Sequence, residues 1–433
     1  MRALIVAAPR SGAGKTTVTL ALLAALRRRG IRVRAAKSGP DYIDGAFHAA
    51  ATGAPCLNLD SWAMPPPLLA GLLARAAGDA ELLVVEAAMG LFDGADATPG
   101  RTGAAADLAR RFGLPVLLVL DVSGQSQSAG AVARGFASYD PGVRVAGTVL
   151  NRVGSERHRA GAAGAVSAVV PVLGAVPRDA GLALPERHLG LVQAQEHGGL
   201  DTLLGCLADF GERCLDLQTV LELATPVPQA TSCPACPAPG LMIALAQDRA
   251  FSFVYPHVLD GWHAAGATVV PFSPLANEPP PAECDACWLP GGYPELHAGT
   301  LAGAHRFLSG LRAFAETRPV HGECGGYMVL GEGLEDANSA WHAMAGLLGH
   351  STSFARRRMT LGYREATLVA DCAAGRAGTV LRGHEFHYAT VTKPGADERF
   401  AHLRDGAGRD IGPAGSRRGR VSGSFFHLIA AQE

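Results

Sequence analysis

Short runs of apolar residues alternate with longer Ala- and Leu-rich segments through the first part of the chain. The short runs have the length of buried strands, and the segments between them have the apolar spacing of helices. This alternation is typical of a parallel α/β sheet, in which a helix follows each strand. We predict a helix over 18–28 and strands at 4–8, 33–37, 82–86, 116–122, 145–151 and 172–176.

The alternation stops at a proline-rich stretch and then begins again. Residues 225–240 read TPVPQATSCPACPAPG, which contains too much proline for a helix or a central strand. Beyond it, apolar strands are predicted at 241–245, 267–271, 286–289 and 319–321. A chain of 433 residues also exceeds the usual size of a single hydrophobic core. We therefore predict two α/β domains, at 1–224 and 241–433, joined by a linker at 225–240.

The composition narrows the choice of partners and compartment. The formal net charge of -1 gives no basic surface for nucleic acid. The chain has neither a signal-peptide pattern nor an apolar run long enough for a bilayer, so we expect a cytoplasmic protein without a membrane partner. Nine cysteines in such a chain favour reduced thiols over a disulfide framework. The oligomeric state stays open, with a homodimer among the options.

The first predicted strand runs into APRSGAGKTT, residues 8–17, which nearly matches a Walker A loop. Gly14, Lys15 and Thr16 match the end of the pattern, whereas Pro9 replaces its first glycine. Strand, glycine-rich loop and helix follow in the order that lets backbone N–H groups and a lysine hold phosphate. The alternative is a βα turn without a ligand. We predict ATP binding by Gly12, Ala13, Gly14, Lys15, Thr16 and Thr17.

Acidic side chains follow two of the predicted strands. Asp41 and Asp44 come after strand 33–37, and Glu86 ends strand 82–86. The carboxyl ends of parallel strands meet at one edge of a sheet, where ligands bind. Because Mg²⁺ prefers oxygen ligands, we predict that Thr16, Glu86 and one of Asp41 or Asp44 bind it beside the nucleotide. Turn formation is the alternative for these two aspartates, and Asp93 either joins a site or makes an Asp-Gly turn.

Other polar stretches leave alternatives open. Asn151 and Arg152 end a predicted strand, where Asn151 is a candidate for reading a base edge. The loop LPERHLGL at 184–191 either contacts nucleotide or substrate or is only a solvated connection. Two Cys-x-x-Cys pairs, at 233/236 and 284/287, raise the option of a four-cysteine zinc site. Small apolar packing is favoured instead, because one pair lies among prolines and Cys287 lies in an apolar strand.

A second candidate site centres on a cysteine. In PVHGECGGYMVL, residues 319–330, an apolar strand turns sharply at Cys324 between small residues and enters a helix, as in a nucleophile elbow. A helix N-terminus stabilises a thiolate, so Cys324 is the candidate reactive cysteine. Its base is predicted to be His427 in GSFFHLI, on a short apolar strand, with His384 and His387 of GHEFHY as competitors.

Three of these motifs together resemble one family. PGGYPE at 290–295, GECGGY at 322–327 and GSFFH at 423–427 resemble the glutamine amidotransferase domain of the cobyrinic acid synthases. The resemblance implies that Cys324 is the nucleophile, His427 its activating base, and the N–H groups of Gly292 and Gly325 the oxyanion hole. Class I triads usually end in His-x-Glu, but Ile429 stands here. Members of this family share the reduced dyad, which leaves open what orients His427.

The N-terminal half is similar to the same family independently. KSGPDYID at 37–44, EAAMGLFDG at 86–94 and LPERHLGL at 184–191 resemble the a,c-diamide synthase branch. The resemblance implies a P-loop parallel sheet like that of dethiobiotin synthetase, followed by a class I glutamine amidotransferase α/β domain. It also implies ATP- and glutamine-dependent amidation of the a and c acetates of cobyrinic or hydrogenobyrinic acid through an acyl phosphate. Lys15, Asp41 and Asp44 are then expected at the phosphorylation site, with Mg²⁺.

Two rival interpretations remain. Cobyric acid synthases amidate four other corrin side chains, but their chains are generally longer, and PDYID and PERHLGL favour the a,c enzyme. Partition-type ATPase switches carry a signature lysine five residues before the P-loop lysine, and Arg10 stands there in this chain. A switch also has no use for Cys324 and His427.

Overall fold

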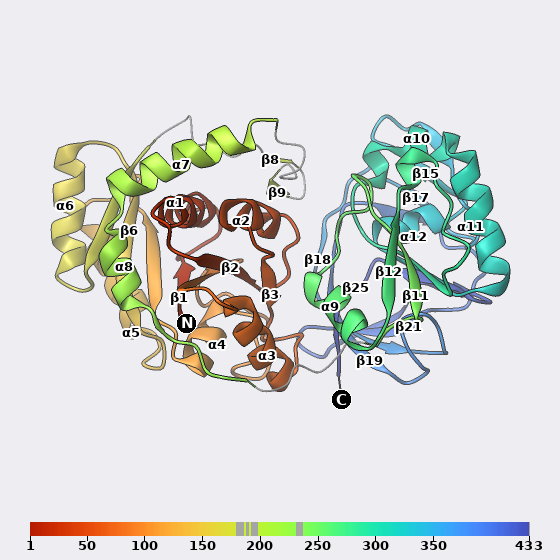
Figure 1. Cartoon of the computed structure of the whole chain (residues 1–433), viewed down its shortest axis with the longest axis horizontal. Helices are drawn as coiled ribbons and strands as arrows, with labels where there is room; N and C mark the ends of the chain where they lie inside the picture. Colours follow the sequence, from red (N-terminus) through yellow and green to blue (C-terminus); the bar gives the residue numbers. More distant parts are fainter. Residues whose placement is uncertain (179–185, 188–189, 192–197, 231–236, 433) are drawn as a thin grey trace. The chain divides into compact units, whose positions relative to one another are not determined.

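The computed structural model describes residues 1–178, 186–187, 190–191, 198–230 and 237–432 of the chain. The chain divides into two compact units (Figure 1), one of Met1–Trp62 with Pro66–Cys233 and one of Ala63–Pro65 with Pro234–Glu433. Part of the predicted linker, residues 231–236, lies outside the described residues. Its first residues, by contrast, form a short strand of the N-terminal sheet, β10 (Thr225–Pro226), which pairs antiparallel with β1 (Arg2–Ala7).

The N-terminal unit is built on a parallel sheet with the strand order β3-β2-β4-β1-β5-β6-β7. All six predicted strands are present, and their β-branched and leucine side chains are buried almost throughout. The three-residue strand β3, at one edge, was not predicted because it is too short to show periodicity. The strands after β1 are β2 (Val33–Ser38), β3 (Leu57–Leu59), β4 (Leu82–Ala87), β5 (Val116–Asp121), β6 (Val145–Val153) and β7 (Val172–Pro177).

Helices cover both faces of this sheet, as the alternating pattern predicts (Figure 1). In the figure, α1, α2 and α7 lie on one side of the strands, and α3 and α4 lie on the other. The helices are α1 (Lys15–Arg28), α2 (Asp44–Thr52), α3 (Pro66–Ala77), α4 (Ala105–Phe112), α5 (Ser128–Ser138), α6 (Glu156–Ser167), α7 (Leu200–Cys214) and α8 (Leu217–Leu223). Two short strands, β8 (Glu186–Arg187) and β9 (Gly190–Leu191), pair with each other.

The C-terminal unit has a mainly parallel sheet with the order β12-β11-β13-β14-β24-β23, in which β23 is antiparallel to β24. Its strands are β11 (Met242–Ala246), β12 (Thr268–Phe272), β13 (Ala286–Leu289), β14 (Val320–Glu323), β23 (Ser416–Arg418) and β24 (Val421–Ser424). The helical elements are α9 (Pro256–Ala264), η3 (Pro274–Ala276), η4 (Pro294–Leu296), α10 (Ala298–Gly303), α11 (His305–Thr317) and α12 (Gly325–Leu330).

Two further sheets that the sequence analysis did not predict complete this unit, one antiparallel and one mixed, in which β15 and β17 are parallel. One has the order β22-β21-β18-β19-β25, and the other has the order β16-β15-β17-β20. The first comprises β18 (Thr360–Leu368), β19 (Val380–His387), β21 (Ala401–Asp405), β22 (Asp410–Ala414) and β25 (His427–Ala431). The second comprises β15 (Gly333–Glu335), β16 (Trp341–Ala343), β17 (Ser351–Ser353) and β20 (Thr390–Lys393). Strand β25 matters most for function, because it carries His427.

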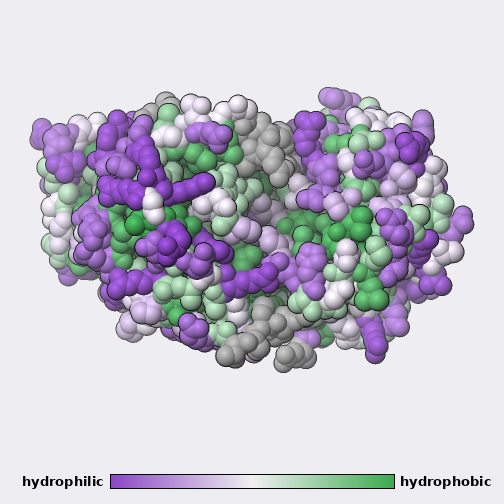
Figure 2. All heavy atoms as spheres, viewed as in Figure 1, coloured by the Kyte–Doolittle hydropathy of each residue, from purple (hydrophilic) through white to green (hydrophobic). Residues whose placement is uncertain are grey.

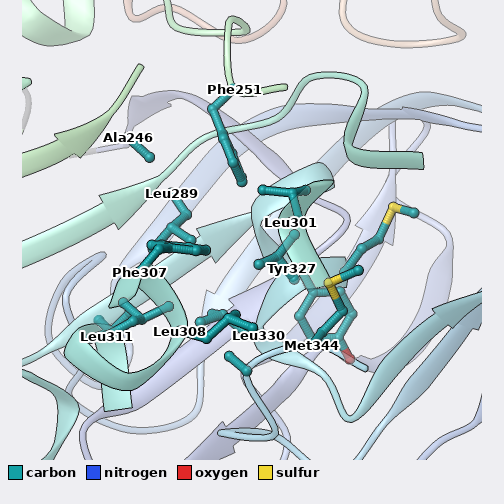
Figure 3. Packing of buried hydrophobic residues seen from close by; sticks show 14 of the residues in the cluster. Ala246, Phe251, Leu289, Leu301, Phe307, Leu308, Leu311, Tyr327, Leu330 and Met344 are labelled. Atoms are coloured by element: carbon teal, nitrogen blue, oxygen red, sulfur yellow. The ribbon is translucent and has the colours of Figure 1, made fainter. Parts of the chain in front are cut away.

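The hydrophobic core of the C-terminal unit lies directly behind the elbow at Cys324. Figure 3 shows Phe307 and Leu311 of α11 packed beside Leu289 at the end of β13 and Leu330 of α12. These side chains are fully buried, so α11 and α12 are held against the parallel strands by loss of apolar surface. The core therefore fixes the strand-to-helix turn that presents Cys324.

The surface offers no broad apolar region on the face displayed in Figure 2, where hydrophilic side chains are interspersed with hydrophobic ones on each unit. Within the described ranges, none of the helices combines the length and the hydropathy needed to cross a membrane.

Candidate active sites

The glycine-rich loop at 8–14 connects β1 to α1, as predicted. Gly14, which precedes the first residue of α1, has φ 88°, a left-handed conformation that favours glycine. A Cβ at this position would also collide with the Asn151 side chain. Lys15 begins the helix and its ammonium lies 3.4 Å from the carbonyl oxygen of Arg10. The loop thus has the backbone of a phosphate-binding turn.

The predicted carboxylates meet at the carboxyl edge of the sheet, around a lysine. Parallel pairing sets Lys37 of β2 opposite Glu86 of β4. The ammonium of Lys37 lies 2.8 Å from Oε1 of Glu86 and 2.5 Å from Oδ2 of Asp44. The Thr16 hydroxyl donates to the same two carboxylates, at 2.8 Å and 3.3 Å. Residues separated by up to 70 positions in the sequence therefore form one cluster.

Buried charges in this cluster are balanced by ion pairs. Glu86 is 0% exposed, and Nε2 of His48 lies 2.7 Å from its second oxygen. Burial opposes ionisation of Glu86, but Lys37 and His48 outweigh it and hold the pKa of Glu86 well below its usual range. Burial alone would lower the pKa of His48, yet the nearby Glu86 carboxylate raises it to about 10. Lys37 and His48, for which sequence analysis gave no role, thus neutralise Glu86.

The two candidate aspartates have different surroundings. Oδ1 of Asp41 accepts the backbone N–H groups of Ile43 and Asp44 at the start of α2. Burial, followed by the charge of Asp44, raises the pKa of Asp41 to about 6. Asp44 contacts both Thr16 and Lys37, at 3.3 Å and 2.5 Å, whereas Oδ2 of Asp41 lies 3.5 Å from the Lys37 ammonium. Of these two carboxylates, Asp44 is the better placed to share a cation with Thr16 and Glu86.

The arrangement of oxygen donors is compatible with Mg²⁺. Thr16, Asp44 and Glu86 supply hydroxyl and carboxylate oxygens, which hard cations prefer. Across the described part of the chain, no group of three or more His, Cys, Asp or Glu side chains is arranged as a metal site. Mg²⁺ usually keeps several waters and phosphate oxygens, so such a complete protein cage is not required.

The other polar candidates of this unit have structural contacts. Asn151 donates to the carbonyl of Ala13 at 2.8 Å and accepts from the N–H of Arg152, so it ties β6 to the phosphate loop. Its reading of a base edge stays a prediction. Oδ2 of Asp93 accepts the N–H of Gly90 at 3.0 Å, which is a turn contact. Residues 184–185 and 188–189 of the 184–191 loop lie outside the described residues.

Of the two Cys-x-x-Cys pairs, for which packing was favoured over zinc, the structure describes one. Cys233 and Cys236 lie outside the described residues, whereas Cys284 and Cys287 are buried free thiols. Burial raises the pKa of both of these thiols, which opposes the thiolate form that zinc requires. The packing role predicted for the second pair fits their position.

Cys324 lies between β14 and α12 in a strained backbone conformation. Its φ is 44° and its ψ is -102°, outside the regions that a side-chain-bearing residue normally adopts. Its N–H donates to the carbonyl of Ser424 on the adjacent strand β24, at 2.8 Å. This is the geometry of the predicted nucleophile elbow, in which the strained turn holds the thiol clear of the backbone.

The other implied residues converge on this elbow. A Cβ built on Gly291 would collide with the ring of His427 and would lie 3.4 Å from Cβ of Cys324. The two side chains therefore flank the same glycine. A Cβ built on Gly325 would lie 3.1 Å from the backbone nitrogen of Gly292. The backbone at Gly325 therefore lies close to the nitrogen of Gly292.

The rival histidines differ in position. His387 contacts the carbonyl of Ala389 through Nδ1 at 2.9 Å and stacks on Phe425. His384 lies opposite His427 on β19, and their rings stack with centroids 4.9 Å apart and an interplanar angle of 11°. Nε2 of His384 is 2.9 Å from the hydroxyl of Tyr255. Of the three histidines, His427 is the one placed beside Gly291 and Cys324.

The resting thiol and imidazole are both neutral, which corrects one expectation. The helix N-terminus was expected to stabilise a thiolate, but burial, and then Glu295, raise the pKa of Cys324 instead. Burial, assisted by His384 and His387, holds the pKa of His427 well below its ordinary value. Cys324 is 4% exposed and His427 is 1% exposed. The helix α12 has only 6 residues, so its dipole is small. Desolvation therefore outweighs the helix dipole here.

Comparisons with known proteins match both domains of the chain. Residues 4–192 match the CobQ/CobB/MinD/ParA nucleotide binding domain, and residues 242–433 match the CobB/CobQ-like glutamine amidotransferase domain. The chain is 62% identical over 432 residues to the hydrogenobyrinate a,c-diamide synthase of Mesorhizobium japonicum, covering 99% of this chain and 98% of that one. The chain belongs to the hydrogenobyrinate a,c-diamide synthase family.

Other members of the hydrogenobyrinate a,c-diamide synthase family are similar over the same length. The synthases of Agrobacterium fabrum and Rhodobacter capsulatus are 61% and 55% identical to this chain, each over 99% of both chains. The predicted resemblance and the two-domain α/β fold are confirmed. Membership of this family also confirms the prediction of a glutamine-dependent ligase that binds a nucleotide.

A buried carboxyl next to the nucleophile generates a pH prediction. Burial raises the pKa of Glu323 from 4.5 to about 8, although its Oε1 accepts the N–H of Leu428 at 2.9 Å. The folded state holds this proton more tightly than the unfolded state does. The resulting contribution to the free energy of unfolding is fully present below about pH 4.5 and is lost as the pH rises from there through about 8. Glu323→Gln keeps the acceptor but removes the titration. Measured by urea unfolding, the free energy of unfolding of the variant should fall less than that of wild type between these pH values, with a difference of about a few kcal/mol at most.

The exposed carboxylate Glu316 on α11 provides the control, since Glu316→Gln should leave the pH dependence of the free energy of unfolding unchanged. Parallel curves for wild type and Glu323→Gln would contradict the prediction.

Proposed function

We propose that this chain amidates the a and c acetate side chains of hydrogenobyrinic acid, with ATP to activate each carboxylate and glutamine as the nitrogen source. The observation that carries the proposal is the presence of two separate sites on one chain, a phosphate loop with clustered carboxylates and a cysteine elbow with a histidine. The names of the similar synthases support the choice of substrate.

In the N-terminal unit, the proposed step is formation of an acyl phosphate. A carboxylate oxygen of the substrate attacks the γ-phosphorus of ATP, and ADP leaves. Residues 12–17 hold the phosphates through backbone N–H groups, and Lys15 supplies positive charge. Ammonia then attacks the acyl carbon, phosphate leaves, and loss of a proton gives the carboxamide. Catalysis here consists of positioning the reactants and neutralising charge.

Thr16, Asp44 and Glu86 are the proposed Mg²⁺ ligands, and Asp41 supports them by holding the loop before α2. Mg²⁺ bound there would offset the negative charge of the phosphates. Lys37 contacts the same carboxylates and keeps them in place.

In the C-terminal unit, the proposed step is glutamine hydrolysis. Cys324 gives its proton to His427 as the sulfur attacks the side-chain carbonyl carbon of glutamine, and His427 then protonates the departing ammonia. Water attacks the resulting thioester, with its proton accepted by His427, and glutamate leaves as the thiol re-forms. We assign the N–H groups of Gly292 and Gly325 to stabilisation of the oxyanion in both halves of the reaction, because their backbones lie close together.

The rival functions are weaker on specific grounds. A partition-type switch shares the nucleotide-binding fold but has no use for a strained Cys324 beside His427. Cobyric acid synthase and the use of the cobalt-containing ring both stay as alternatives to be tested with substrate.

The proposal is tested by product analysis. The chain, with ATP, Mg²⁺ and glutamine, should convert hydrogenobyrinic acid into its diamide, and mass spectrometry should locate both new amides on acetate side chains. Exclusive turnover of cobyrinic acid, or amidation of propionate side chains, would replace the proposed substrate with one of the alternatives. ATP hydrolysis that neither corrinoid nor glutamine stimulates would favour the switch.

Replacing the nucleophile should separate the two half-reactions. Cys324→Ser is expected to lower glutamine-fed amidation by more than about 10³-fold, because serine is a far weaker nucleophile at neutral pH. Amidation fed by a high concentration of ammonium salt should stay near wild type, because only the nitrogen source is lost. His427→Asn should behave in the same way, and loss of both activities in a folded variant would refute the division of labour.

Replacing the buried carboxylate should have the opposite effect. Glu86→Gln is expected to slow ATP-dependent amidation by roughly 10²- to 10³-fold and to raise the Mg²⁺ requirement, because a charged oxygen ligand is lost. Basal glutaminase activity should be retained and reports whether the C-terminal unit is intact. Asp44→Asn should act similarly, whereas Asp79→Asn, an exposed carboxylate beside Arg34, should have no effect. Normal amidation by Glu86→Gln would place the metal elsewhere, with Asp93 the next candidate.

A further inference from the structure

The structure suggests what orients His427, which has no carboxylate two residues further along the chain. Ile429 stands at that position on β25 and is buried. The backbone carbonyl oxygen of Ile429 lies 2.8 Å from Nε2 of His257. The residue two positions after His427 therefore does not supply the carboxylate of a class I triad. A catalytic imidazole nevertheless needs a fixed ring plane to take a proton from one atom and deliver it to another.

The ring stacked on His427 belongs to His384. Strands β19 and β25 pair antiparallel with His384 directly opposite His427, and the register shifts just before this pair. The strands approach closely at Gly383, where a Cβ would collide with the carbonyl of His427. This close approach brings the two rings nearly parallel, at the 4.9 Å separation of their centroids. The stack is thus a consequence of strand pairing, which fixes both backbones.

His384 is itself anchored. Its Nε2 hydrogen-bonds the hydroxyl of Tyr255, which is buried just before α9, and this bond sets the plane of the His384 ring. Arg364 on β18 is the charged group that acts on His384, and Arg364 is paired with Glu385 at 2.6 Å. Burial, followed by Arg364, lowers the pKa of His384 to about 3, so its ring is neutral.

We propose that His384 is a positioning residue of the glutaminase site, which holds the imidazole of His427 by ring stacking while Tyr255 holds His384. This inference rests on the proposed roles of Cys324 and His427. The stacked ring of His384 gives the His427 ring a flat neighbour on one face, and packing against it restricts the ring plane.

The test compares variants of His384 that keep or remove a flat ring. His384→Ala should lower kcat for glutamine hydrolysis roughly 10- to 100-fold, because a misplaced catalytic group costs about that much, and should leave KM for glutamine within about two-fold. His384→Phe keeps a flat ring and should recover most of kcat. Tyr255→Phe, which removes one hydroxyl and little volume, should lower kcat less than His384→Ala does. Ammonia-fed amidation should be unchanged in all three variants.

His402→Ala is the matched control, since His402 is an exposed histidine on β21 paired with Asp410, and its kcat should equal that of wild type. A kcat for His384→Ala equal to that of wild type would overturn the proposal. Near-complete and equal losses of kcat in His384→Ala and His384→Phe would also overturn it, because they would make His384 the base. A parallel loss of ammonia-fed amidation would reduce its role to general folding. His427→Asn, measured beside these variants, distinguishes failure of the positioning role from failure of the proposed dyad. Glutaminase activity retained by His427→Asn would overturn the dyad itself.

Discussion

The N-terminal site depends on the neutralisation of one fully buried carboxylate, that of Glu86. Removing a charge from water is costly unless an opposite charge and hydrogen bonds replace the lost solvation. Parallel pairing of β2 with β4 puts Lys37 opposite Glu86, and α2 supplies His48 on its other side. With Glu86 fixed in this way, Thr16 at the start of α1 is fixed by its bond to the same carboxylate. The phosphate loop, the second strand and the second helix therefore share one electrostatic centre.

The C-terminal site follows the opposite physical rule. Its thiol and imidazole are desolvated, and both are neutral at rest. Positioning there comes from backbone geometry at Cys324, from the glycines around it and from the stack of His427 on His384. A neutral buried thiol reacts slowly with electrophiles, because the thiolate is the nucleophilic form. One chain thus combines a site whose buried charges are paired with a site whose buried thiol and imidazole are neutral.

The sequence predicted the parts of the structure that depend on local pattern. The phosphate loop, the six strands of the first sheet and the elbow at Cys324 all have short-range signals of periodicity or glycine placement. His427, by contrast, was preferred over His384 and His387 through the family resemblance. Lys37, His48 and His384 were not assigned their contacts, because those contacts join strands and helices far apart in the sequence. His384 and His427, for example, meet through antiparallel pairing across 43 positions, in a sheet whose strands gave no clear alternation. The thiol pKa was misjudged because burial depends on packing that no local pattern reveals.

The strained backbone at Cys324 also bears on how such a chain changes over generations. A side chain at this φ and ψ costs of order 1–3 kcal/mol, a sizeable part of the net stability of a typical domain. Glycine would relax the turn, so selection for folding alone would favour losing the cysteine. The residue persists under that pressure only while released ammonia benefits the cell. Copies of the gene freed from this need are expected to lose the thiol early and to keep the fold.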